Sequence, residues 1–152
     1  MNRIFLDMDG VLVNFDEYKD VCGLSGDEVK KLQGAYLSMN PLQGAISGVH
    51  SLIGMGFDVW VATKPPTGIA WAYSDKASWI FSYLPELKRK LIITPDKGLL
   101  GDEKDFLVDD RPHKANCEKF RGTLVVFGTQ ICPDWQALIQ YFKEVRGVRI
   151  YA

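Results

Sequence analysis

Five short apolar runs, separated by stretches with helical periodicity, constrain the fold of this chain more than any other feature. The runs are bounded by polar or turn residues and lie at 3–8, 57–63, 90–94, 105–110 and 123–127. Short apolar runs of this kind are typical of buried strands. The first two intervals between runs are long enough for crossover helices, so the pattern predicts an α/β fold with a parallel sheet and helices on both faces.

Helical patterns lie between and after these runs, and one segment stands apart from the alternation. Apolar residues recur every three or four positions in 45–53, 72–83 and 133–145. Residues 14–40 instead hold two short amphipathic patterns, and Ser25 and Glu28 between them have the spacing of a capping box. We therefore expect a single domain over 1–152 with a small helical cap at about 14–40, inserted after the first strand.

Composition excludes several classes of partner. The formal net charge is -1, which gives no basic surplus for a nucleic-acid polymer or an acidic membrane. The three cysteines have no Cys-x-x-Cys spacing, so neither a disulfide framework nor a zinc site is indicated. No signal-like start or membrane-length apolar run is present, so we expect a cytoplasmic protein with a small-molecule partner. The sequence leaves the oligomeric state open, a homodimer included.

Polar residues gather where the predicted strands end. They are Asp7 and Asp9 after the first strand, Thr63 and Lys64 after the second, Lys97 after the third, and Asp109 and Asp110 after the fourth. Ligands of open parallel sheets bind at the carboxyl ends of the strands, so these residues are expected to share one crevice. Carboxylates about 4 Å apart repel by roughly 4 kcal/mol per pair at an effective dielectric constant near 20. A bound Mg²⁺, which prefers oxygen ligands, would remove that cost.

This arrangement suits phosphoryl transfer. Asp7 can attack phosphorus and form an acyl-phosphate, while Asp9 protonates the leaving alkoxide and later deprotonates a water molecule. Thr63 supplies a hydrogen-bond donor and Lys97 a fixed positive charge for the phosphate oxygens. Gly10 permits the sharp turn that follows the strand.

Four segments carry a resemblance to a known superfamily. The sequences "DMDGV" at 7–11, "VAT" at 61–63, "PDK" at 95–97 and "LVDDRP" at 107–112 resemble, in order and spacing, the four motifs of the haloacid dehalogenase (HAD) phosphatases. Within that superfamily, "PLQGAISGV", "KASWI" and "DWQALI" are similar to the 5′(3′)-deoxyribonucleotidase family. The resemblance implies a Rossmann-like, HAD-like fold, dependence on Mg²⁺ and hydrolysis of (deoxy)nucleoside monophosphates.

The resemblance also implies a role for each site residue. Asp7 is the nucleophile and a metal ligand, and Asp9 is the acid/base and binds metal through its backbone carbonyl. Asp110 is a metal ligand with Asp109 beside it. Phosphate is bound by Thr63, Lys97 and the Lys64 amide, and Phe15 stacks on the base. The cap is shorter than is usual in the family, and Lys64 stands where relatives commonly have a small hydroxyl residue. Phe15 fits the core of the cap equally well. Neighbouring residues of an extended chain point to opposite sides, so only one of Asp109 and Asp110 is expected to ligate directly.

Three other functions are consistent with parts of this pattern. A receiver-type signalling module also places acidic residues, Thr and Lys on a doubly wound sheet, although its phosphorylated Asp follows a later strand. A nucleotide-binding protein without catalysis is a second alternative, and a hydrolase of sugar phosphates or other small phosphomonoesters is a third. Away from the site, we expect Asp102, Glu103 and Asp105 to form a solvated turn.

Overall fold

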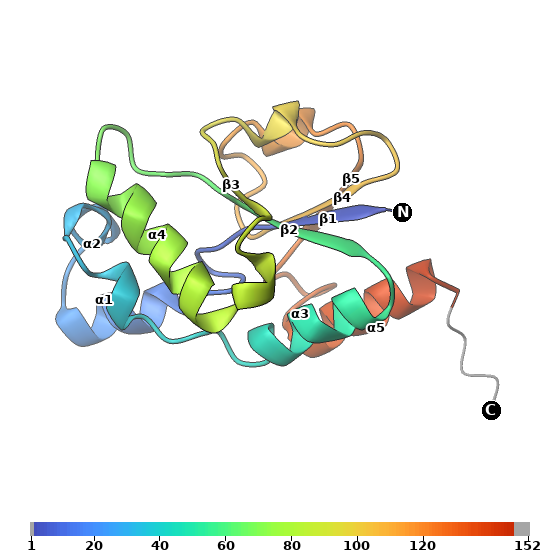
Figure 1. Ribbon diagram of the computed structural model, residues 1–152, viewed down its shortest axis with the longest axis horizontal. Coiled ribbons are helices and arrows are strands. Elements are labelled where there is room, and N and C mark those ends of the chain that lie inside the picture. The colour runs from blue at the N-terminus through green and yellow to red at the C-terminus, as the bar shows by residue number, and fades with distance from the viewer. Residues whose placement is uncertain (1, 148–152) are drawn as a thin grey trace.

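Residues 2–147 are described by a computed structural model, in which five parallel strands form one sheet. The strands are β1 (Arg3–Leu6), β2 (Asp58–Thr63), β3 (Leu91–Ile93), β4 (Phe106–Asp109) and β5 (Thr123–Val126). Their order in the sheet is β3-β2-β1-β4-β5 (Figure 1). Each strand falls inside one of the predicted runs, and the predicted α/β class with a parallel sheet is confirmed.

Three longer helices connect and follow the strands. They are α3 (Ala45–Gly54), α4 (Ala70–Tyr83) and α5 (Trp135–Val145). The last helix was expected from Pro133 but begins at Trp135, because the Asp134 side chain caps it by accepting a 2.9 Å hydrogen bond from the Ala137 amide. Among residues 2–147, no helix has the length and apolar character needed to cross a membrane.

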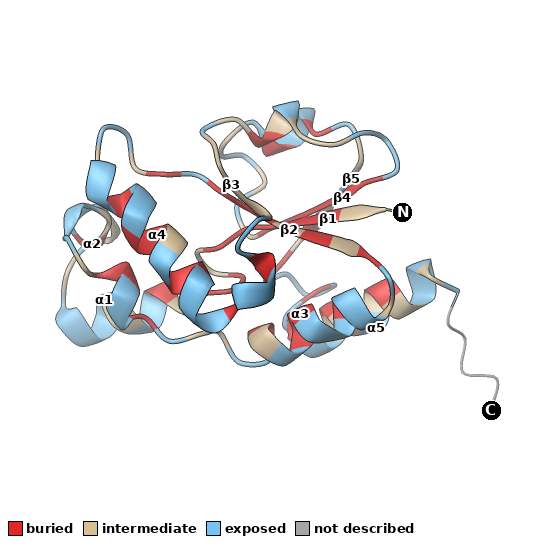
Figure 2. Cartoon of the chain, viewed as in Figure 1, coloured by how far each residue is buried: buried red, intermediate tan, exposed pale blue. Residues whose placement is uncertain are grey.

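The two faces of the sheet are covered differently. Alternate residues of β1 enter different cores: Ile4 and Leu6 pack with α3, α4 and α5, whereas Phe5 packs with Cys117 and Phe120. The second face carries short 3₁₀ helices, η3 (Lys97–Leu99) and η4 (Cys117–Lys119), with adjoining loops. Right-handed connections from β3 to β4 and from β4 to β5 must cross this face, and both are short and interrupted by Pro and Gly. Figure 2 shows the strands as a largely buried layer between these covers.

The segment expected to form the cap contains two short helices, α1 (Phe15–Cys22) and α2 (Gly26–Lys31), and the 3₁₀ helix η1 (Tyr36–Ser38). The Ser25 and Glu28 capping box is present, as predicted. The second amphipathic pattern was expected to continue to Tyr36, but α2 ends at Lys31. At Gly34 the backbone has a φ of 82°, and its amide donates a 2.7 Å hydrogen bond to Asp75 of α4. This tertiary contact ends the helical pattern and ties the segment to α4.

The connections place one position of the sheet at a topological switch point. After β1 the chain moves to β2 on one side, whereas after β4 it moves to β5 on the other side. The carboxyl ends of β1 and β4 are neighbours there, because Leu6 pairs with Val108. Crevices at such points are where open α/β sheets bind ligands.

Candidate active site

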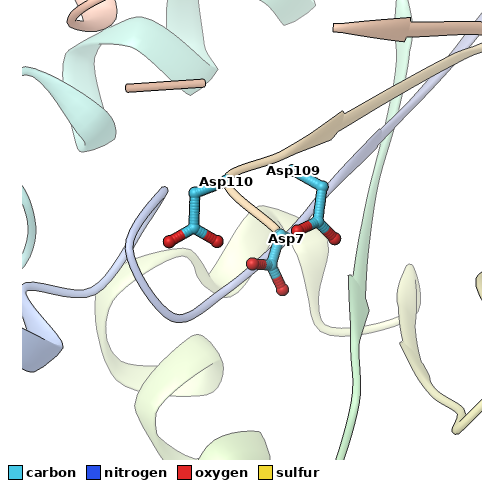
Figure 3. Close-up of side chains that lie close together, drawn as sticks. All are labelled: Asp7, Asp109 and Asp110. Carbon is cyan, nitrogen blue, oxygen red and sulfur yellow. The ribbon is translucent and has the colours of Figure 1, made fainter. Parts of the chain in front are cut away.

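Three carboxylates converge at the switch point. Asp7 follows β1, Asp109 ends β4 and Asp110 comes next, and one oxygen of each lies within 4.8 Å of the others. Figure 3 shows the three side chains turned toward the same space. All three line a cavity of about 480 Å³, which is within the range of small-molecule sites. The sheet therefore brings together acidic residues that lie about a hundred positions apart in sequence.

Lys97 forms ion pairs with two of these carboxylates. It is 2% exposed, and its Nζ donates hydrogen bonds of 2.7 Å to Asp7 Oδ1 and to Asp109 Oδ2. Burial acts against the charged ammonium, but Asp7 and Asp109 outweigh burial and raise the pKa of Lys97. Lys97 is thus a fixed cation that holds the Asp7 carboxylate in place.

The surroundings of Asp110 disfavour its charged form. Its Oδ1 is buried and has no hydrogen-bond partner among the described residues. Burial, followed by the negative charges of Asp7 and Asp109, raises the pKa of Asp110 to about 8. Gly10, with a φ of 82°, lies directly against this carboxylate, where a Cβ atom would overlap Asp110 Oδ2. Only glycine fits both the backbone conformation and the space at position 10.

The donor set fits a magnesium ion. All three groups offer carboxylate oxygens, and a cation would give the orphaned Asp110 Oδ1 a partner. Both oxygens of Asp109 already accept hydrogen bonds, from the Arg111 amide at 2.8 Å and from Lys97. This distribution favours Asp7 and Asp110 as direct ligands, with Asp109 holding Lys97. The Asp9 carboxylate is outside the cluster of three, and the expected contribution of Asp9 is its backbone carbonyl.

A second network holds the Asp9 side chain. Asp9 Oδ2 accepts hydrogen bonds from the Tyr36 hydroxyl at 3.0 Å and from Lys76 Nζ at 3.4 Å. Lys76 is completely buried, donates a 2.7 Å hydrogen bond to Thr63 Oγ1 and lies 4.6 Å from the centre of the Tyr36 ring. Burial and the Asp9 charge raise the pKa of Tyr36, so its hydroxyl keeps the proton that it donates. The network links β2, α4 and the cap segment to one carboxylate.

Sequence reasoning missed Lys76 and Tyr36 as site residues. Lys76 was placed among the apolar positions of a helical stripe with Ala72 and Trp79, and Tyr36 was placed in an amphipathic cap pattern. The available signal was the lysine itself, because a cation on the buried face of a helix needs a carboxylate partner.

The remaining predicted residues lie at different depths. Lys64 is exposed and lines the cavity, whereas Thr63 is 1% exposed and is not among the residues found to line it in the described part of the chain. Phe15 is 6% exposed, packs 6.2 Å from the Tyr36 ring and also lines the cavity. Both roles considered for Phe15, cap core and base platform, are compatible with this position.

The expectation of a solvated turn is wrong for Asp105. This residue is 2% exposed and accepts hydrogen bonds of 2.9 Å from the Arg3 amide and 3.0 Å from Arg3 Nε. Asp105 is a structural ion-pair partner on the side of the sheet where β1 and β4 begin, opposite the cavity.

Comparison with known proteins relates most of the chain to nucleotidases. The family model described as "5' nucleotidase, deoxy (Pyrimidine), cytosolic type C protein" matches residues 29–136. A protein of Vibrio phage KVP40 named "Putative 5'(3')-deoxyribonucleotidase" is 30% identical over 149 residues, which cover 93% of this chain and 84% of that protein. A protein of Bordetella bronchiseptica with the same name is 28% identical over 109 residues, covering 71% of this chain and 57% of its own.

Solved structures with the same fold are more distant in sequence. A hydrolase from Pseudomonas syringae superposes with a TM-score of 0.60 at 12% identity, covering 95% of this chain and 99% of that one. A HAD family hydrolase from Deinococcus radiodurans R1, with bound phosphate and sodium, has a TM-score of 0.56 at 13% identity, covering 93% and 87%. At this level of identity the likeness concerns the fold, which is HAD-like.

Proposed function

Because this chain belongs to the deoxy (pyrimidine) 5′-nucleotidase family, cytosolic type C, and is therefore a HAD-type phosphatase, we propose that it hydrolyses (deoxy)nucleoside monophosphates with the help of Mg²⁺. The observation that carries this proposal is the Asp7 carboxylate, which lines the cavity with Asp109 and Asp110 and is held there by Lys97. We also propose that residues 1–152 form one catalytic domain with a cap at about 14–40.

Asp7 is the proposed nucleophile. One of its carboxylate oxygens attacks the phosphorus atom and forms an acyl-phosphate, while the bond from phosphorus to the nucleoside oxygen breaks. A water molecule then attacks the same phosphorus atom, which releases inorganic phosphate and restores the carboxylate. The hydrogen bond of 2.7 Å from Lys97 holds one oxygen of Asp7 and leaves the other free for the attack.

Asp9 is the proposed proton carrier. It gives a proton to the departing nucleoside oxygen in the first step and takes one from water in the second. Tyr36 and Lys76 both donate to Asp9 Oδ2, whereas Oδ1 is buried and has no partner among the described residues. The two donors thus orient the acid for both steps.

The phosphate oxygens need positive charge and hydrogen-bond donors. When bound by Asp7 and Asp110, Mg²⁺ would supply charge that draws electron density from the phosphate. We propose that Lys97 supplies further positive charge to the phosphate oxygens and that the Lys64 backbone amide donates a hydrogen bond to them. Lys76 donates to Thr63 Oγ1 at 2.7 Å, which leaves the Thr63 hydroxyl proton for an acceptor. Because Thr63 is buried behind the residues that line the cavity, its hydroxyl contacts a phosphate oxygen only if that oxygen passes between them.

A second candidate substrate class keeps the same chemistry. The cap segment contains two short α-helices, of eight and six residues, and the 3₁₀ helix η1, and these offer few side chains that could select a base. Phe15, Pro66 and Ile69 supply apolar cavity wall for a nucleoside. A small sugar phosphate would use the same reaction centre without needing that wall.

A panel of phosphomonoesters tests the proposal. Release of phosphate from dUMP, dTMP, ribonucleotides and sugar phosphates would be measured with Mg²⁺ and with a chelator. We expect turnover only with Mg²⁺ and a kcat/KM for dUMP or dTMP at least about tenfold above that for sugar phosphates. A preference for sugar phosphates would select the second candidate, and no turnover of any ester would overturn the proposed function.

A further inference from the structure

The cavity has a rim of five cations above its acidic floor. These rim cations are Lys30 and Lys31 of α2, Lys64 after β2, and Arg111 and Lys114 after β4. Within residues 2–147, none of the five charged side-chain groups has a carboxylate oxygen within 4.0 Å of its nitrogen atoms. Apart from the floor carboxylates, Asp27 is the one acidic residue in the described part of the chain that lines the cavity. Three separate segments of the chain thus direct unpaired positive charge to one opening.

Two of the rim cations, Lys30 and Arg111, line the same cavity from different segments of the chain. Lys30 is partly buried, with its Nζ 5.9 Å from the centre of the Phe15 ring. Burial lowers the pKa of Lys30, and the Arg111 charge lowers it further. Like charges that share a partly desolvated site are unfavourable unless an anion lies between them. The pair therefore has the properties of an anion site.

The transferred phosphate does not account for all of the rim cations. The floor holds four carboxylates, those of Asp7, Asp9, Asp109 and Asp110. Lys97 binds two of them and Lys76 binds that of Asp9, and Asp7 and Asp110 would hold the metal ion. Lys97, Lys76 and Mg²⁺ together balance these four negative charges, so a phosphate dianion bound there draws on the rim. Its two negative charges match only part of the rim, where five cations face Asp27 alone. A nucleoside monophosphate has no further charged group to offer the rim, so the rim indicates a substrate with a second anion.

Building on the proposed function, we propose that the rim cations bind a second phosphate and that the enzyme accepts nucleoside 3′,5′-bisphosphates. One phosphate lies at Asp7, and the other lies between Lys30 and Arg111. A cavity of about 480 Å³ is large enough to hold the nucleoside between them. A nucleic-acid polymer is a weaker fit, because the net charge of -1 provides no basic track beyond the rim.

Calorimetry on the Asp7→Asn variant with Mg²⁺ tests the second site without turnover. We expect thymidine 3′,5′-bisphosphate to bind at least about tenfold more tightly than dTMP, and the ratio to fall as salt screens the rim. Lys30→Gln and Arg111→Gln, made in the same background, should each weaken the bisphosphate about threefold or more beyond any change for dTMP. Lys114→Gln tests the rim at a further, exposed residue. Lys88→Gln, also exposed but outside the cavity, is the control that should change neither affinity.

Equal affinity for the two ligands, or equal losses for both in the rim variants, would overturn the second site. Tighter binding of a 3′-phosphorylated oligonucleotide than of the bisphosphate would overturn it as well, in favour of a polymer end. Turnover of dTMP by the wild-type protein is measured separately and reports on the proposed function alone. If that turnover is absent, the ratio of the two affinities still decides whether the rim binds a second phosphate.

Discussion

At the scale of the residue, the sharpest prediction concerns Asp7. Asp7→Asn keeps the side-chain volume but removes the attacking oxygen, so we expect kcat for dTMP to fall at least about 10³-fold with little change in the melting temperature. Phosphate release and circular dichroism measure the two quantities. Asp20→Asn removes an exposed carboxylate of α1 and serves as the matched control. A rate near that of the wild type in Asp7→Asn would exclude a covalent mechanism at this residue.

Tyr36 tests the hydrogen bonding of Asp9. Tyr36→Phe removes the 3.0 Å hydrogen bond to Asp9 Oδ2 and keeps the ring in the core. We expect a loss of about 1 kcal/mol in the free energy of unfolding. The rate should fall more for dTMP than for p-nitrophenyl phosphate, whose leaving group needs no proton. Comparing kcat for the two substrates measures this, and equal losses on both would contradict an acid oriented by Tyr36.

The same residues show how far single positions can be predicted. Asp7 and Asp110 directly follow strands and Lys97 lies in the connection after β3, and parallel strands bring their carboxyl ends to one edge whatever the order of the sheet. Lys76 cannot be found in this way, because it lies within a helix. Only the packing of α4 on β2 brings its ammonium to Thr63 and Asp9.

At the scale of the element, the contact of α3 with α5 offers a matched pair of glycines. A Cβ atom at Gly48 would overlap the Trp135 ring, whereas one at Gly54 has open space. We expect Gly48→Ala to lower the free energy of unfolding by about 1–3 kcal/mol through overpacking. Gly54→Ala should raise it by up to about 1 kcal/mol, because Ala favours the helix. Urea unfolding measures both, and equal effects would show that α3 and α5 do not pack closely here.

The Gly48 variant also tests whether this packing reaches the site. Trp135 Nε1 donates a 2.7 Å hydrogen bond to the carbonyl of Val11, in the loop that follows β1 and carries Asp9 and Gly10. A displaced Trp135 should therefore reduce kcat as well as stability. Activity measured well below the melting temperature separates the two effects.

Elements were predictable where local pattern and tertiary structure agree. The strands were found because parallel strands buried on both faces are continuously apolar. The second amphipathic pattern of the cap predicted helical structure up to Tyr36, but α2 ends at Lys31. The local pattern gives no sign of the hydrogen bond that Gly34 donates to Asp75, which is far away in sequence. The second face was expected to carry helices, but the short connections there allow only η3 and η4.

At the scale of the whole molecule, Asp105 links stability to pH. Burial acts to raise the pKa of Asp105, but hydrogen bonds from Arg3 and Asp102 outweigh it and hold the pKa below the ordinary value of 3.8. The unfolded state therefore takes up a proton at higher pH than the folded state does. The stabilisation is present above about pH 4 and is lost as the pH falls through the folded-state pKa.

Urea unfolding between pH 2 and 6 checks this linkage. We expect Asp105→Asn to be less stable than the wild type by about 1–3 kcal/mol at pH 6, and the difference to shrink below about pH 4. Asp102→Asn changes the more exposed carboxylate of the same turn and should have a smaller effect. A difference that does not vary with pH would mean that Asp105 acts through packing alone.

The acidic floor makes the stability of the whole chain depend on the metal. Asp7, Asp109 and Asp110 offer oxygens within 4.8 Å of one another, and Lys97 compensates only part of their charge. A ligand that binds only the folded state raises its stability, by about 2.7 kcal/mol at a hundred times the dissociation constant. We therefore expect Mg²⁺ to raise the melting temperature and a chelator to reverse the change.

Asp110→Asn removes both a ligand and a repelling charge, so it should abolish the Mg²⁺ response while leaving the metal-free protein at least as stable as the wild type. An undiminished rise of the melting temperature with Mg²⁺ in Asp110→Asn would place the ion elsewhere. A lower melting temperature of metal-free Asp110→Asn would show that contacts of the Asp110 carboxyl group stabilise the fold more than its charge destabilises it.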